Sequence, residues 1–158
     1  MKINLKYLVF IAIFAVLGFS REFLFVNINN QLFTLYYQNV GYTLPNSLGL
    51  FNDLDYTTLY YLKYPLTVLY FLAYFLTSFF AIKLICLHKK NALWVIYIYS
   101  LLLVLSGISM AYNYMINNQL GGDEYTISRW LMGIAQSPLV TFFIIASSKL
   151  YTKFQPQL

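Results

Sequence analysis

The chain has 158 residues, of which 60% are hydrophobic, 20% aromatic and only 9% charged. This composition excludes an ordinary soluble domain, in which about a quarter of the residues are charged. The formal net charge of +5 does not indicate nucleic-acid binding, because the basic residues flank apolar stretches and form no long cluster. The sequence therefore predicts an integral membrane protein.

Four apolar stretches are long enough to cross a bilayer, whose hydrocarbon core of about 30 Å takes about 20 residues of helix. In chain order they are residues 7–26, 64–87, 92–116 and 127–150. The connections are short except for an outer loop over 27–58, so we expect residues 1–158 to form a single membrane domain. An all-α polytopic fold with a four-helix transmembrane bundle is the simplest architecture.

The first stretch follows Lys2 and Lys6, an arrangement that also fits a cleaved secretory signal peptide. The apolar run continues over residues 23–26, however, beyond the small residues Gly18 and Ser20 where cleavage would occur. We therefore expect the first span to be retained.

The outer loop carries the pattern of a further helix. Ile28, Leu32 and Leu35 recur at helical spacing, which predicts a short interfacial helix lying on the membrane surface. Asp55 is placed to cap the start of the second span. An outer aromatic belt is expected from Tyr56, Tyr60, Tyr61, Tyr64, Tyr125 and Trp130.

The spans are oriented by their lysines, because basic residues concentrate on the cytoplasmic side. One set of span ends carries Lys2, Lys6, Lys83, Lys89, Lys90, Lys149 and Lys153. The opposite ends carry all five acidic residues, Glu22, Asp53, Asp55, Asp123 and Glu124. Both termini are therefore predicted to be cytoplasmic.

Charged residues interrupt the apolar runs near their outer ends. A charge at the centre of a spanning helix costs about 2.5–3.5 kcal/mol on insertion scales, so it usually has a partner or a task. We predict that Glu22, Lys63 and Arg129 converge, with an ion pair between Glu22 and Arg129 and with Gln136 deeper in the bundle. Arg21, on an adjacent face, is expected to reach lipid phosphate or an acid of the outer loop.

Pro138 removes a backbone donor from the middle of the fourth stretch, which predicts a kink near Gln136 and Ser137. Small and polar residues of each stretch fall on one face, which we expect to point toward the other helices. From the first stretch to the fourth, these faces are Ala15, Gly18, Glu22; Lys63, Thr67, Tyr70, Tyr74, Thr77, Ala81; Ser100, Gly107, Ala111, Tyr114; and Arg129, Gly133, Gln136, Val140, Phe143, Ser147.

The single cysteine, Cys86, excludes an intrachain disulfide, and the single histidine, His88, excludes a histidine-rich metal site. Two residues apart, these side chains would lie on different sides of a helix, which argues against a catalytic pair. We therefore predict no cofactor, no metal site and no catalytic constellation.

Two short motifs carry a family resemblance. Arg21-Glu22-Phe23 with the following Asn-Ile-Asn-Asn-Gln-Leu (27–32), and Arg129 with Gln-Ser-Pro-Leu (136–139), resemble the small exosortase-associated membrane proteins of bacteria. The resemblance covers almost the whole chain. It implies a non-catalytic accessory subunit in the bacterial cytoplasmic membrane, beside an exosortase, a membrane cysteine transpeptidase that processes proteins bearing C-terminal sorting signals. Besides membrane lipids, the partner would be this larger membrane protein. The implied contact residues or polar core are Arg21, Glu22, Gln31, Arg129 and Gln136.

Two other function classes stay open. A small proton-coupled transporter would use Glu22 as its titrating carboxylate, although such sites usually lie nearer the midplane of the membrane. An enzyme acting on lipid-linked phosphate would hold the phosphate with Arg21, Lys63 and Arg129, with Glu22 alone available as acid or base.

Overall fold

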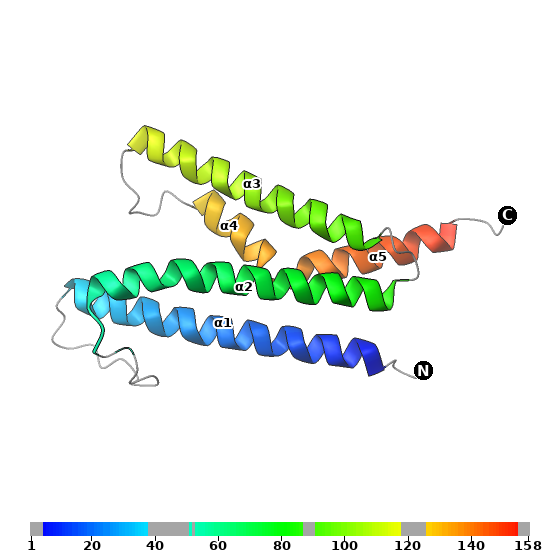
Figure 1. Cartoon of the computed structure of the whole chain (residues 1–158), viewed down its shortest axis with the longest axis horizontal. Helices are drawn as coiled ribbons and strands as arrows, with labels where there is room; N and C mark the ends of the chain where they lie inside the picture. Colours follow the sequence, from blue (N-terminus) through cyan, green and yellow to red (C-terminus); the bar gives the residue numbers. More distant parts are fainter. Residues whose placement is uncertain (1–4, 38–50, 52, 87–90, 118–125, 155–158) are drawn as a thin grey trace. The chain divides into compact units, whose positions relative to one another are not determined.

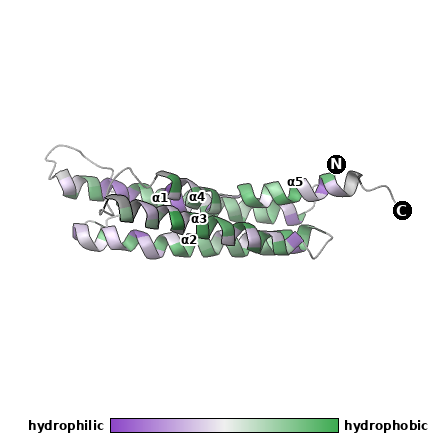
Figure 2. Ribbon diagram, turned by 90° about the horizontal axis from the view of Figure 1, so that it is seen from above, coloured by the Kyte–Doolittle hydropathy of each residue, from purple (hydrophilic) through white to green (hydrophobic). Residues whose placement is uncertain are grey.

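A computed structural model describes residues 5–37, 51, 53–86, 91–117 and 126–154, and these contain helices and no strand. The helices are α1 (Leu5–Tyr37), α2 (Tyr56–Ile85), α3 (Asn91–Asn117), α4 (Thr126–Ala135) and α5 (Leu139–Phe154) (Figure 1). Helices α1, α2 and α3 are long and apolar enough to cross a membrane, and α4 with α5 would make a fourth span if the bent pair is one span. Hydrophobic residues predominate along these ribbons (Figure 2). The predicted all-α membrane fold is confirmed.

The helices pack as two compact units. One contains residues 1–14 and 71–158, and the other contains residues 15–70. Both α1 and α2 contribute residues to each unit. That the whole chain forms a single membrane domain stays a prediction.

The first span differs from expectation in its length. α1 continues without a break over 33 residues to Tyr37, so the separate interfacial helix expected in the 27–58 loop is instead the end of the same helix. Ile28 and Leu32 are buried against Leu59 of α2, not against lipid headgroups. A separate surface helix and an extension of α1 would show the same helical spacing of apolar residues. The contact with Leu59 of α2 favours the extension.

Within residues 15–70, α1 and α2 run antiparallel. The Tyr70 hydroxyl donates to Ser20 Oγ at 3.1 Å at one end, and the rings of Tyr36 and Tyr56 lie 6.1 Å apart at the other. Around the buried core of Ile28, Leu32 and Leu59 pack the partly buried side chains of Leu35, Phe51, Leu54, Tyr60, Leu62 and Leu66. This end of the helix pair has its own apolar core.

Helix α2 begins at Tyr56, earlier than the predicted start of the second span, and Asp55 occupies the predicted capping position. The Thr58 hydroxyl and the backbone amides of Thr57 and Thr58 hydrogen-bond the carboxylate, which lowers the pKa of Asp55 from its usual value. The Asp55 carbonyl also accepts the backbone N–H of Leu59 at 3.1 Å. The cap satisfies amides that an uncapped helix start leaves without partners.

In the other unit, α4 and α5 return along α3 (Figure 1). The buried residues of α3 are Ala92, Val95, Tyr99 and Ser106. The face expected from small residues is wrong here, because Ser100, Gly107 and Ala111 are exposed. In a membrane helix the lipid-facing and core-facing sides are both apolar, so residue size alone does not identify the packed face.

The predicted kink in the fourth span is confirmed, and it is a complete interruption. Helices α4 and α5 meet at 61°. Ser137 Oγ donates to the Ile134 carbonyl at 2.7 Å and accepts the Leu139 N–H at 3.4 Å. Pro138 lies between them, directly before the first residue of α5. A serine cap followed by proline favours a new helix start.

This restart changes which residues of α5 are buried. Gln136 and Val140 of the expected stripe are buried, as are Thr141 and Ile144. Phe143 and Ser147 of the stripe are exposed. The stripe assumed one uninterrupted helix through Pro138, and the bend alters its phase.

Candidate functional site

The six residues predicted to form an outer polar cluster divide between the two units. Residues 15–70 contain Arg21, Glu22, Gln31 and Lys63, and the other unit contains Arg129 and Gln136. The proposed ion pair between Glu22 and Arg129 would join the two units and stays a prediction.

Glu22 is exposed on α1, a helix long and apolar enough to cross a membrane. The inward face expected from Ala15, Gly18 and Glu22 is wrong, because Ala15 is exposed as well. Lys149 Nζ lies 5.1 Å from the centroid of the Tyr7 ring, a basic–aromatic pairing typical of a membrane interface. At 1.5 Å per residue, Glu22 lies about 22 Å further along α1, a distance shorter than a hydrocarbon core of about 30 Å. Among the described residues, no group forms a hydrogen bond or ion pair with its carboxylate.

The other residues of the predicted polar cluster differ in exposure. Arg21 is half-buried, with its guanidinium carbon 5.5 Å from the Phe25 ring centroid, a cation–π contact within the same helix. Lys63 and Gln31 are also half-buried. Arg129 is exposed on α4.

Three hydroxyl groups form the most deeply buried polar cluster of the other unit. Thr141 Oγ1 donates to Ser78 Oγ at 2.7 Å, and Ser78 Oγ lies 2.9 Å from the Tyr99 hydroxyl. None of the three residues is more than 1% exposed. The rings of Phe71 and Phe75 pack against the Tyr99 ring in T-shaped geometry. Their centroids lie 5.6 and 5.4 Å from the Tyr99 centroid. This hydroxyl cluster connects α2, α3 and α5.

Two further polar contacts attach the fourth span to α3. Ser106 Oγ lies 2.8 Å from Ser128 Oγ of α4, and Asn91 Nδ2 donates to Ser148 Oγ of α5 at 2.8 Å. No buried side-chain nitrogen or oxygen among the described residues lacks a hydrogen-bond partner. The polar side chains of these contacts hold helices together.

Gln136 lies at the interruption between α4 and α5 and is 4% exposed. Its backbone N–H donates to the Met132 carbonyl at 2.9 Å, which completes the last turn of α4. The interruption between α4 and α5 therefore lies beside a buried amide side chain.

Sequence reasoning did not single out the hydroxyl cluster. A search for hydroxyl residues in the middle of the spans would have found Ser78 and Thr141. Tyr99 was not distinguishable from the other tyrosines, because only packing separates a buried phenol from an interfacial one.

Cys86 is free and half-buried, whereas His88 lies outside the described residues. No group of three metal-binding side chains occurs in the described part of the chain. Comparison with protein-family models, curated proteins and solved structures found no match.

Proposed function

We propose that this chain is a non-catalytic accessory or scaffold subunit of a membrane complex. The supporting observation is Glu22, an exposed carboxylate on a helix that is long and apolar enough to cross a membrane. Acidic residues in spanning helices almost always face a protein interior or a water-filled cavity and pair with another group. A basic side chain on a helix of a partner protein would satisfy this carboxylate.

The alternative of exposure to lipid is unfavourable for this residue. Long lysine and arginine side chains can extend to the interface, but glutamate is short, and Glu22 lies about 8 Å from the outer boundary by its position on α1. The family resemblance makes an exosortase in a bacterial cytoplasmic membrane the first partner to test, with both termini of this chain cytoplasmic.

The test is co-purification in a mild detergent from native membranes. Wild-type protein is expected to retain a larger membrane protein, and Glu22→Gln is expected to lose it while accumulating normally. Asp53→Asn, at an exposed acid outside the spans, is the matched control and is expected to keep the partner. Recovery of the wild type alone in several mild detergents would refute the proposal.

A charge exchange separates this proposal from an internal ion pair. If Glu22 pairs with Arg129 of the same chain, Glu22→Arg combined with Arg129→Glu restores stability and function. If Glu22 binds a partner, the exchange fails, and a compensating acidic substitution in the partner restores association.

A second candidate is a small proton-coupled transporter, which the interrupted fourth span favours. Buried Gln136 and the 61° bend resemble the broken helices around transporter binding sites. Purified protein in liposomes would then take up a substrate with protons, and Gln136→Leu would abolish uptake. Absence of proton movement across a panel of imposed gradients would count against this function.

A further inference from the structure

Helices α1 and α2 are longer than a bilayer requires. At 1.5 Å per residue, the 33 residues of α1 and the 30 residues of α2 measure about 50 and 45 Å, against a hydrocarbon core of about 30 Å. Twenty residues from the inner markers Tyr7 and Lys83 reach Asn27 on α1 and Lys63 on α2. The antiparallel contact between Leu32 and Leu59 places these two positions at the same level.

The ends of both helices therefore extend past the outer boundary in the predicted topology. Tyr56 lies about 10 Å and Tyr36 about 13 Å beyond it, whereas the headgroup layer accounts for only about 5–8 Å on each side. A tilt of about 20° shortens these heights by less than a tenth. The buried core of Ile28, Leu32 and Leu59 stabilises this projecting part.

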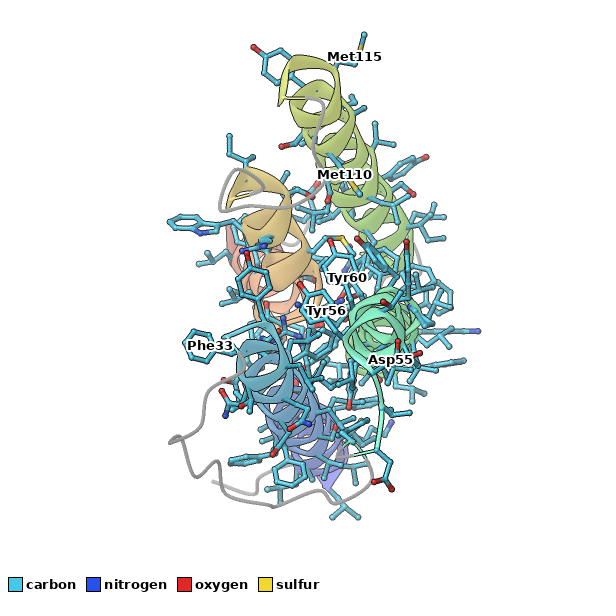
Figure 3. All side chains as sticks on the ribbon, turned by 90° about the vertical axis from the view of Figure 1, so that its left-hand side faces the viewer. Phe33, Asp55, Tyr56, Tyr60, Met110 and Met115 are labelled. Atoms are coloured by element: carbon cyan, nitrogen blue, oxygen red, sulfur yellow. The ribbon has the colours of Figure 1, made fainter. Side chains whose placement is uncertain are left out.

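Five tyrosines line one another on the projecting part, and we call them the tyrosine ridge: Tyr36, Tyr56, Tyr60, Tyr61 and Tyr64. Successive ring centroids along α2 lie 6.2 Å apart from Tyr56 to Tyr60 and 5.8 Å apart from Tyr60 to Tyr64. Tyr36 and Tyr61 are 67% and 64% exposed. In Figure 3, Tyr56 and Tyr60 lie toward the seam between α1 and α2, whereas Phe33 points away from α2.

Interfacial anchoring accounts for only part of this ridge. Tyr64 lies at the hydrocarbon boundary and Tyr60 and Tyr61 within the headgroup layer, as an aromatic belt requires. Tyr36 and Tyr56 lie beyond the layer that a phospholipid headgroup occupies. A ligand that covers the whole ridge must begin at headgroup level and extend into water.

The chemistry of the ridge favours a sugar. Tyrosine combines a flat apolar face with a hydroxyl group, which match the C–H face and the hydroxyl rim of a pyranose ring. Tyr60 is partly buried against the core, and the other four tyrosines of the ridge are exposed. All exposed large hydrophobic side chains among the described residues 27–37 and 53–64 are aromatic. The same stretches of α1 and α2 also carry Asn29, Asn30, Gln31 and Thr57, whose side chains are donors and acceptors suited to sugar hydroxyls.

We infer that the tyrosine ridge binds the sugar headgroup of a glycolipid in the outer leaflet. The lipid places the first sugar at the level of Tyr60 and Tyr64, and further sugar rings stack toward Tyr56 and Tyr36. This binding site is independent of the contact proposed for Glu22.

Native mass spectrometry tests the assignment with diglucosyl diacylglycerol and phosphatidylglycerol of identical acyl chains, offered in equal amounts in mixed micelles. The wild type is expected to retain the glycolipid preferentially. Replacing Tyr36 and Tyr61 together by leucine is expected to reduce this preference about tenfold, since two aromatic stacking contacts are lost. Phenylalanine at both positions keeps the stacking and is expected to retain most of it.

Tyr112→Leu is the matched control, because Tyr112 of α3 is 64% exposed, like Tyr61, and is not part of the ridge. Tyr112 lies about 31 Å along α3 from Asn91, a distance close to the thickness of the hydrocarbon core. It is expected to bind as the wild type does. Equal retention of the two lipids by the wild type would overturn the inference, whether or not the leucine variant folds. An unchanged preference in a folded leucine variant would also overturn it, as would competition by free disaccharide at the concentrations where the glycolipid binds.

Discussion

The hydroxyl cluster of Ser78, Tyr99 and Thr141 gives the most quantitative expectation for stability. Ser78 lies at its centre, with Thr141 Oγ1 at 2.7 Å and the Tyr99 hydroxyl at 2.9 Å. An interhelical hydrogen bond in a membrane protein contributes about 0.6 kcal/mol on average and about 1.7 kcal/mol at most. Thr141→Val, which preserves shape and removes one donor, should reduce the free energy of unfolding by an amount in this range.

Ser78→Ala is expected to lower the free energy of unfolding by more than Thr141→Val does, because it leaves the Tyr99 hydroxyl buried without its partner. A stranded buried hydroxyl costs about 1–3 kcal/mol, and Tyr99 has no backbone carbonyl of its own turn within reach of its distant hydroxyl. Thr141 can turn its hydroxyl to a backbone carbonyl one turn earlier in the chain, at Ser137 or Pro138. Most of the loss should therefore come from Tyr99.

A double substitution tests this assignment. Adding Tyr99→Phe to Ser78→Ala removes the stranded hydroxyl, so the double variant should be more stable than Ser78→Ala alone. Unfolding in mixed detergent micelles, followed by far-ultraviolet circular dichroism, measures the differences. Ser100→Ala, at the exposed neighbouring position, should change stability by less than about 0.5 kcal/mol. If the two substitutions simply add their losses, the reasoning about coupled hydroxyls is refuted.

Three further expectations concern separate parts of the molecule. Hydrogen bonds, chiefly from the Thr58 hydroxyl, lower the folded pKa of Asp55 from 3.8. The stabilisation that Asp55 gives to the start of α2 is therefore present above pH 3.8 and is lost as pH falls through the folded pKa. An NMR titration of the first-turn amides should show this step, and Asp55→Asn should remove it. Alanine at Gly107 or Gly133 meets no atom within 4 Å and should stabilise each helix by about 0.5–1 kcal/mol in the same unfolding assay, whereas destabilisation would reveal a packing partner. Ser106→Ala removes the 2.8 Å contact with α4 and should speed hydrogen exchange in α4 more than in α2; equal protection before and after would contradict that role.

The sequence by itself determined the class of the protein and several local features. Long apolar stretches with basic residues at one set of ends are sufficient to predict membrane helices. Asp55 at the start of α2 and Pro138 at the interruption were also predictable, because capping and the missing proline donor act within one turn of the chain. Such features depend on neighbouring residues only.

The tertiary structure decided which faces pack and where helices end. α1 continues to Tyr37 because Ile28 and Leu32 pack on Leu59, a contact between residues far apart in sequence. The buried face of α3 and the position of Tyr99 were hidden for the same reason. In lipid, the outward face of a helix is as apolar as its packed face, so hydropathy loses the periodic signal that marks the core side of a soluble helix.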